Sequence, residues 1–160
     1  MAIIAIALSV PKSPFLSGLV EGSSPGLIPS SNYVANLKSS DIDLVRESLA
    51  ILKDRKDPAG VPSALPLLQS PDDYVWLNAA LYTGAFGKQE AVPYLIKALR
   101  HTAWHSDPDT IAILKILTSQ DFGSDFGKWQ AWWLGQHPRA SFDWTSHLGF
   151  QPRVPTSQRS

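Results

Sequence analysis

The chain carries an internal repeat with an offset of 31 residues, and this repeat constrains the fold more than any single motif does. Apolar residues and one proline recur at the same spacing. The matching positions are Leu44, Val45, Leu49, Val61, Pro62, Leu65 and Leu68 in the first copy, and Val75, Trp76, Ala80, Val92, Pro93, Ile96 and Leu99 in the second. A period of this length is typical of stacked helix pairs, in which each pair buries its apolar side against its neighbour.

Start signals and apolar spacing divide the first copy into two helices. One apolar face marks a helix over residues 40–55, for which Ser40 is the expected N-terminal cap. Its partner starts near Ala59. We expect this second helix to be short or kinked, because Pro66 falls in its interior and cannot donate the helical hydrogen bond.

The second copy is predicted to lie at the centre of the stack. Its first helix, over residues 72–86 with Ser70 as the expected cap, is apolar nearly all round, as buried helices are. Its partner runs over residues 89–103, and the spacing places Lys97 and Arg100 on the outward side.

A third pair starts at Asp107 and continues to a last helix marked by Phe126, Trp129 and Trp133 at i, i+3 and i+7. The aromatic residues around this helix are expected to seal the end of the stack, since the last helix pair of a solenoid has no neighbour. Trp132 lies off that stripe and is therefore a candidate docking residue.

The predicted organisation has three parts: an extended arm over residues 1–38, a repeat domain over 39–137 and a C-terminal tail over 138–160. The arm is rich in proline, serine and glycine, which disfavour a regular helix. Its apolar residues make it a candidate binding peptide, with the anchors Phe15, Leu16, Leu19, Val20, Leu27, Ile28 and Tyr33.

Residues 1–10 leave the compartment open. They are apolar but too short to span a bilayer, which takes about 20 residues. They resemble the apolar part of a secretion signal without its basic start, which would indicate a periplasmic or membrane-associated protein. Alternatively they form an apolar docking peptide, and a cytoplasmic location is the favoured interpretation.

Composition excludes several functions. The 14 basic and 14 acidic residues cancel and form no basic stripe, so no nucleic-acid partner is expected. Without cysteine there is no thiol nucleophile or thiolate metal ligand. His101 and His105 have a helical metal-ligand spacing but no identified third ligand. Asp121 and Asp125 flank a glycine turn and could form an acid–base pair, but one of them is better explained as the cap of the following helix. We therefore expect no catalytic residue, metal or cofactor.

The exposed side of the second helices is the expected partner-binding surface. On the inner surface of such stacks, the second helix of each pair faces the partner. The candidates on this strip are Tyr94, Lys97, Arg100, His101 and Trp104.

The second pair resembles the HEAT-like repeat of the phycocyanobilin-lyase type, a short bacterial relative of HEAT and armadillo repeats. The residues that carry the resemblance are Asp73, Val75, Ala79, Ala80, Leu81, Gly84, Gly87, Glu90, Ala91, Val92, Pro93, Leu95, Ile96 and Leu99. The resemblance covers about residues 40–135 and implies an all-α solenoid of about three helix pairs. Such repeats serve mostly as binding surfaces and only sometimes in bilin attachment.

We therefore expect a non-catalytic protein–protein interaction scaffold, a subunit of a larger bacterial assembly that is bound through the arm and the concave helix face. A small solenoid with an apolar, weakly charged arm has more adhesive surface than a monomer needs. Two alternatives stay open: a bilin lyase or isomerase-like enzyme, which the resemblance implies, and a periplasmic, membrane-associated helper protein.

Overall fold

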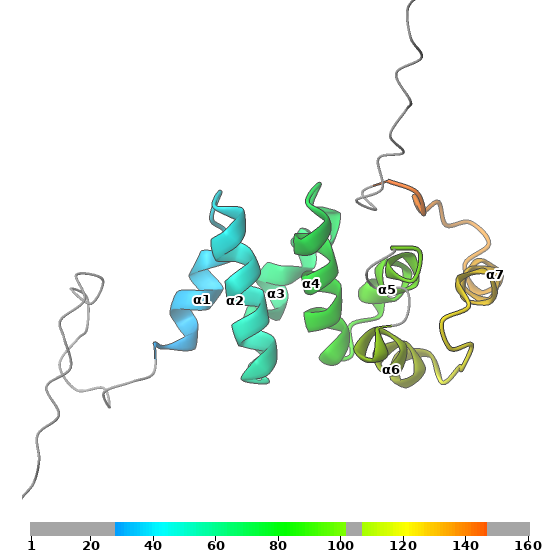
Figure 1. Ribbon diagram of the computed structural model, residues 1–160, viewed down its shortest axis with the longest axis horizontal. Helices are drawn as coiled ribbons and strands as arrows, with labels where there is room; N and C mark the ends of the chain where they lie inside the picture. Colours follow the sequence, from blue (N-terminus) through cyan, green and yellow to red (C-terminus); the bar gives the residue numbers. More distant parts are fainter. Residues whose placement is uncertain (1–27, 102–106, 147–160) are drawn as a thin grey trace, which may run out of the picture.

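The computed structural model describes residues 28–101 and 107–146, and every regular element within these ranges is helical. Figure 1 shows the helices in chain order along the long axis of the molecule, from α1 to α7. The first helices of successive pairs contact one another, α2 with α4 and α4 with α6, while α5 contacts α7 in the other row. The prediction of a short all-α solenoid is confirmed.

The first pair consists of α2 (Ile42–Asp54) and a broken partner. That partner is a 3-10 turn followed by the four-residue helix α3 (Val61–Ala64) and a second 3-10 segment over Leu65–Gln69. The break coincides with Pro66, which has no N–H to continue the α-helical ladder. The predicted short or kinked helix is therefore correct.

Helix α4 (Asp73–Ala85) forms the centre of the core. Nine of its 13 residues are buried, and the Trp76 side chain is only 2 % exposed. The helix contacts α2, α5 and α6, so its apolar surface is covered on several sides. Helix α5 (Val92–Ala98) ends earlier than the sequence predicted.

The third pair comprises α6 (Pro108–Thr118) and α7 (Phe126–Gln136). Asp107 and Asp125 cap these two helices, accepting hydrogen bonds from the backbone N–H groups of Thr110 and Lys128. The third pair thus starts at Asp107 as predicted, and of the two candidates Asp121 and Asp125 it is Asp125 that caps the last helix. They satisfy N–H groups that have no partner within the helix.

Two other predicted caps are wrong. Helix α2 is capped by Asp41 rather than Ser40, and α4 by Asp72 rather than Ser70. Asp72 also joins the first two repeats, because its carboxylate accepts hydrogen bonds of 2.9 and 3.1 Å from one guanidinium nitrogen of Arg46 on α2. Asp72 therefore caps α4 and also forms an ion pair with Arg46 of the preceding repeat.

The boundary predicted at residue 38 also needs correction. Residues assigned to an extended arm form α1 (Ser30–Asn36), which packs against α2. Pro29 precedes the helix at the N-cap position, where its fixed φ and missing N–H do no harm. Tyr33 on α1 lies 4.8 Å from the Arg55 guanidinium, and Arg55 donates a hydrogen bond of 2.7 Å to the carbonyl of Ile28.

Candidate partner-binding site

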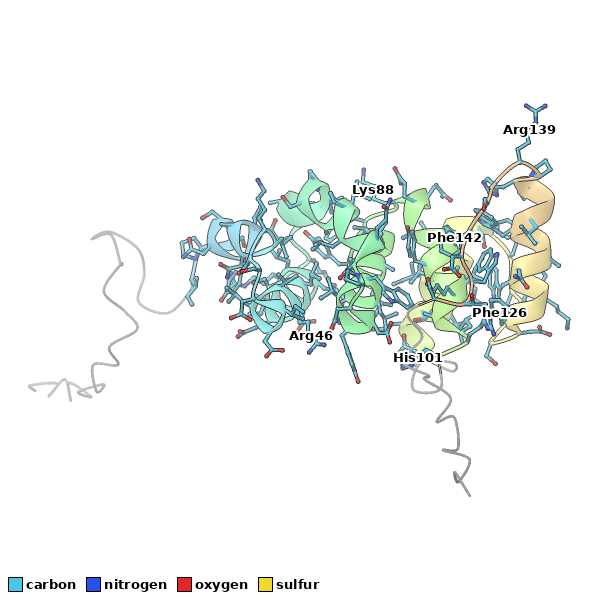
Figure 2. The ribbon with its side chains drawn as sticks, turned by 90° about the horizontal axis from the view of Figure 1, so that it is seen from above. Arg46, Lys88, His101, Phe126, Arg139 and Phe142 are labelled. Carbon is cyan, nitrogen blue, oxygen red and sulfur yellow. The ribbon has the colours of Figure 1, made fainter. Side chains whose placement is uncertain are left out.

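A segment that follows α7 packs against α5. We call residues 141–146 the strap. Phe142 meets the Tyr94 ring edge to face, with ring centroids 4.9 Å apart, and Trp144 meets Trp133 of α7 in the same way at 5.3 Å. In Figure 2, Phe142 lies between α5 and α7, whereas Arg139 at the end of α7 points away from the molecule. The strap therefore seals the groove between two neighbouring helices.

Hydrogen bonds from Lys97 and Arg100 fix the position of the strap on α5. The Lys97 ammonium group donates to Ser146 Oγ at 3.2 Å, and Arg100 donates to the carbonyl of Trp144 at 3.1 Å. The Asp143 carboxylate accepts the backbone N–H groups of Thr145 and Ser146, at 2.9 and 3.0 Å. Hydrogen bonds from Ser146 and Thr145 lower the pKa of Asp143 well below its ordinary value.

This arrangement corrects two sequence predictions. The predicted open strip contains Tyr94, Lys97 and Arg100, and the strap covers all three in part. Lys97, expected to point into solvent, is only 4 % exposed. The predicted boundary at residue 138 is also displaced, because the strap packs as part of the repeat domain.

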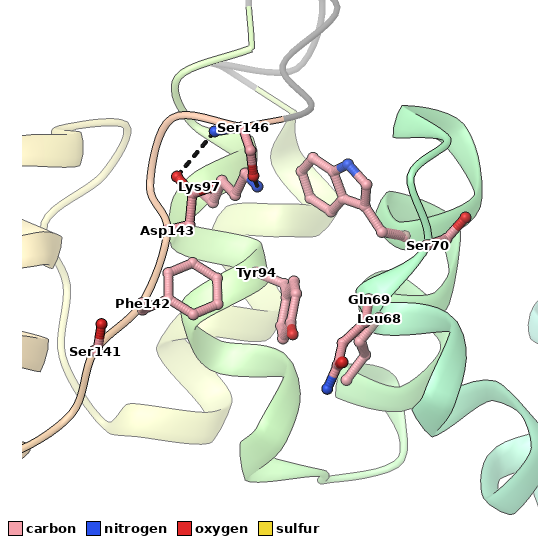
Figure 3. Close-up of a pocket in the computed structure, with 10 residues that line it drawn as sticks. Leu68, Gln69, Ser70, Tyr94, Lys97, Ser141, Phe142, Asp143 and Ser146 are labelled. Atoms are coloured by element: carbon pink, nitrogen blue, oxygen red, sulfur yellow. Dashed lines mark hydrogen bonds between the residues drawn. The ribbon is translucent and has the colours of Figure 1, made fainter.

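A cavity of about 260 Å³ remains beside the strap. Figure 3 shows Tyr94, Phe142 and Lys97 on one side of it and Leu68 and Gln69 on the other. Its lining comes from three parts of the chain: the end of the first pair, α4 with α5, and the strap. The full set is Leu68, Gln69, Ser70, Trp76, Tyr94, Lys97, Ser141, Phe142, Asp143 and Ser146.

Lys97 is a buried cation in a mainly aromatic setting. Its Nζ lies 5.2 Å from the Trp76 ring centroid and 5.9 Å from that of Phe142, within the range of cation–π attraction. Burial lowers the pKa of Lys97, because the charged form loses hydration, while the charges of Asp143 and Asp73 act in the opposite direction. Burial likewise raises the pKa of Tyr94.

The tryptophans of α7 form the expected cap. Trp129 is fully buried and donates its indole N–H to the carbonyl of Gly123 at 2.9 Å. Trp132, proposed from sequence as an exposed docking residue, is half-buried and meets Trp129 edge to face at 6.1 Å. Part of its ring therefore contributes to the cap and part remains accessible.

The other predicted partner-binding residues are scattered or lie outside the described ranges. Ile28 is exposed, Tyr33 is half-buried at the opposite end of the stack from α7, and His101 is half-buried just after α5. The structure does not bring Ile28 and Tyr33 together with the strap. The predicted residues outside the described ranges are Phe15, Leu16, Leu19, Val20, Leu27 and Trp104.

A second hollow, of about 500 Å³, lies among the C-terminal ends of α2 and α4 and the side of α6. Phe86, Ala112 and Ile113 give it an apolar wall. Lys53 and Asp109 form an ion pair of 3.7 Å and also line it. Lys53 thus has a carboxylate partner, whereas no ion pair between described residues involves Lys97.

The described residues contain no cluster of three side chains able to hold a metal ion. His105 lies outside them, so the predicted histidine spacing is not tested. Asp121 pairs with Lys115 at 2.7 Å, while Asp125 is occupied as a helix cap. Within the described ranges, no helix combines the length and hydropathy that crossing a bilayer would require.

The packing of the strap on α5 is the feature of the candidate site that the sequence did not predict. Phe142 and Trp144 alternate at i and i+2, a spacing typical of an extended segment with one apolar face. Sequence analysis grouped both with the terminal cap. The alternation predicts an extended peptide, whereas residues 144–146 form a bend in which Asp143 accepts the N–H groups of Thr145 and Ser146. The contacts of Phe142 with α5 and of Trp144 with α7 become visible only in the folded chain.

The stacked helix pairs define the class as an α-solenoid. The family model described as HEAT repeats matches residues 32–113, and the chain belongs to this family. None of the curated proteins matches the chain significantly, and neither does any of the solved structures. The family match and the all-helical stack agree with the predicted HEAT-like fold. Proteins of this repeat class commonly act as interaction scaffolds.

Proposed function

We propose that the chain is a non-catalytic protein–protein interaction scaffold and a subunit of a larger assembly. The partner docks on the surface beside the strap, formed by Gln69, Ser70 and Tyr94, which we call the second-helix face. HEAT repeats commonly mediate such interactions, which supports the class of function. The bacterial origin of that assembly and a second contact through residues 1–27 are further parts of the proposal.

One observation carries the proposal: the adjoining surface of α5 already holds a peptide segment without regular secondary structure. The strap contributes two aromatic anchors and one main-chain acceptor to the surface along α5, the elements with which grooves recognise extended ligands. Next to the strap the same surface continues into an open cavity with an aromatic wall. A partner segment that lies alongside the strap would bury this wall.

Photo-cross-linking in cells that naturally produce the protein tests the proposal. A benzophenone amino acid replaces Gln69, which is exposed at the cavity, or Glu47, which is exposed on α2. We expect a single discrete adduct from position 69 and none of the same mass from position 47. Equal labelling at both positions, or none at position 69, would argue against the second-helix face as the contact.

The non-catalytic part of the proposal has its own test. Adding a bilin to the purified chain should leave the visible spectrum of the bilin unchanged. A spectral change on mixing would indicate that the chain binds the bilin and would support the enzymatic alternative.

A further inference from the structure

We propose that the cavity beside Lys97 binds a carboxylate that the protein partner presents together with an aromatic side chain. This inference rests on the proposed function and names the chemistry of the partner segment. It follows from the lining of the cavity, the burial of one cation and the absence of a described counter-ion at that cation.

The first observation is that the Lys97 ammonium lacks an ion-pair partner within the described ranges. Ion pairs there join Arg46, Lys53, Lys115 and Lys128 to aspartates, and none involves Lys97. An ammonium group has three N–H donors, and Ser146 Oγ is the acceptor that the described residues supply. Two of its donors have no acceptor among the described residues, and a buried cation gains most from an ionised acceptor.

The acid on the strap does not fill this role. Asp143 lines the same cavity, yet its Oδ1 is turned back on its own segment and accepts bonds from Thr145 and Ser146. In Figure 3 the dashed bond joins Asp143 to Ser146, with the end of Lys97 nearby. The negative charge of Asp143 favours the charged form of Lys97, but the described hydrogen bonds of Asp143 come from Thr145 and Ser146 and not from the Lys97 ammonium.

The second observation is the size and lining of the cavity. Its volume of about 260 Å³ equals that of roughly eight or nine waters at about 30 Å³ each, enough for a small ring bearing a carboxylate. Three aromatic rings, Trp76, Tyr94 and Phe142, contribute to the wall. Aromatic groups pack well against such rings in offset or edge-to-face arrangements. The positive charge of Lys97 and the aromatic lining of the cavity together favour a ligand that carries an acidic group next to an aromatic ring.

Phenylacetate and phenylacetamide test this chemistry, because the two probes share size and ring and differ in charge. Each is titrated into the full-length chain at constant ionic strength and followed by ¹H–¹⁵N NMR. The Trp76 indole N–H and the amides of Gln69 and Ser146 report on the cavity. We expect saturable shifts at these positions and an affinity at least about tenfold higher for phenylacetate.

Variants assign the charge dependence to Lys97. Lys97→Met should reduce phenylacetate binding to the level of phenylacetamide, whereas Lys97→Arg should retain a preference for the acid. Lys53→Met, in the other hollow, is the matched control and should change nothing. If Lys97→Met does not fold, the comparison of the two probes on the wild-type chain still decides the question. Equal affinities, or shifts that map away from the cavity, would overturn the proposal.

Titration with two peptides distinguishes a protein segment from a free organic acid as the ligand of the cavity. The peptides Ac-Gly-Phe-Glu-Gly-NH₂ and Ac-Gly-Phe-Gln-Gly-NH₂ differ only in the carboxylate, and the first should bind at the same residues with the larger affinity. Binding of phenylacetate without discrimination between the peptides would refute the partner segment as the ligand. The outcomes are separable from the cross-linking result: an adduct at position 69 with no preference for acids overturns this inference and leaves the scaffold function standing.

Discussion

Removing the main aromatic anchor of the strap should expose Lys97 to reagents in solution. Truncating a fully buried phenylalanine to alanine costs about 3–5 kcal/mol. Phe142 is half-buried against Tyr94, Trp133 and Trp144, so we expect Phe142→Ala to destabilise the closed strap by about 2 kcal/mol. At 1.4 kcal/mol per factor of ten, that is roughly a 30-fold rise in the open population.

Acetylation with limiting reagent, followed by mass spectrometry, measures this population. In the wild-type chain, Lys97 should be modified far more slowly than the exposed Lys38. In Phe142→Ala the rate at Lys97 should rise by about 30-fold while the rate at Lys38 stays constant. Phe122→Ala, a truncation of a half-buried ring at the cap, is the control and should leave Lys97 protected. An unchanged rate at Lys97 in Phe142→Ala, or an equal rise in Phe122→Ala, would refute the reasoning.

Three further predictions concern the stack and its titrating groups. Gly84→Ala should lower the free energy of unfolding by about 1–3 kcal/mol in a urea titration, because the added Cβ would lie 2.8 Å from Ile113 Cγ2 and 3.0 Å from Leu95 Cδ1; unchanged stability would contradict this close approach. Tyr82→Phe should cost about 1–3 kcal/mol in the same assay, since the buried hydroxyl donates to the carbonyl of Asp57 and accepts the N–H of Gly60; a cost near zero would mean that water replaces it. Burial lowers the pKa of Lys97 below its ordinary value of 10.5. Between the folded-state pKa and 10.5, the unfolded chain binds more protons at Lys97 than the folded chain does, so the free energy of unfolding rises with pH. The stability of the wild type relative to Lys97→Met should therefore increase towards pH 10.5, and a decrease would contradict the burial of this lysine; the raised pKa values of Tyr82 and Tyr94 favour unfolding above pH 10 in both proteins and cancel in the difference.

Local periodicity was sufficient to predict the stack. The 31-residue repeat and the all-round apolar pattern of α4 depend on neighbours along the chain, and both identify packed helix pairs. Pro66 likewise acts within its own segment and breaks the first partner helix where expected. The left-handed Gly87, with φ of 77° just after α4, follows the same local logic.

The sequence predictions were wrong in two situations. In one, two neighbouring residues were equally good helix caps; in the other, a segment distant in the sequence determined whether a side chain is exposed. Ser70 and Asp72 are both good cap residues, and the ion pair with Arg46 on another helix favours the aspartate. Lys97 has the spacing of an outward residue, yet the strap that covers it lies 49 residues further along at Ser146. No pattern local to α5 contains that information.

The account depends most on the claim that the strap covers α5 in solution, and one NMR measurement tests it directly. In the full-length chain, the Phe142 ring should give cross-relaxation peaks to the Tyr94 ring and to the side-chain methylenes of Lys97. Those peaks are expected because the two rings lie 4.9 Å apart and the Lys97 Nζ lies 5.9 Å from the Phe142 centroid. Random-coil shifts over residues 141–146, with no peak from Phe142 to either residue, would contradict the claim.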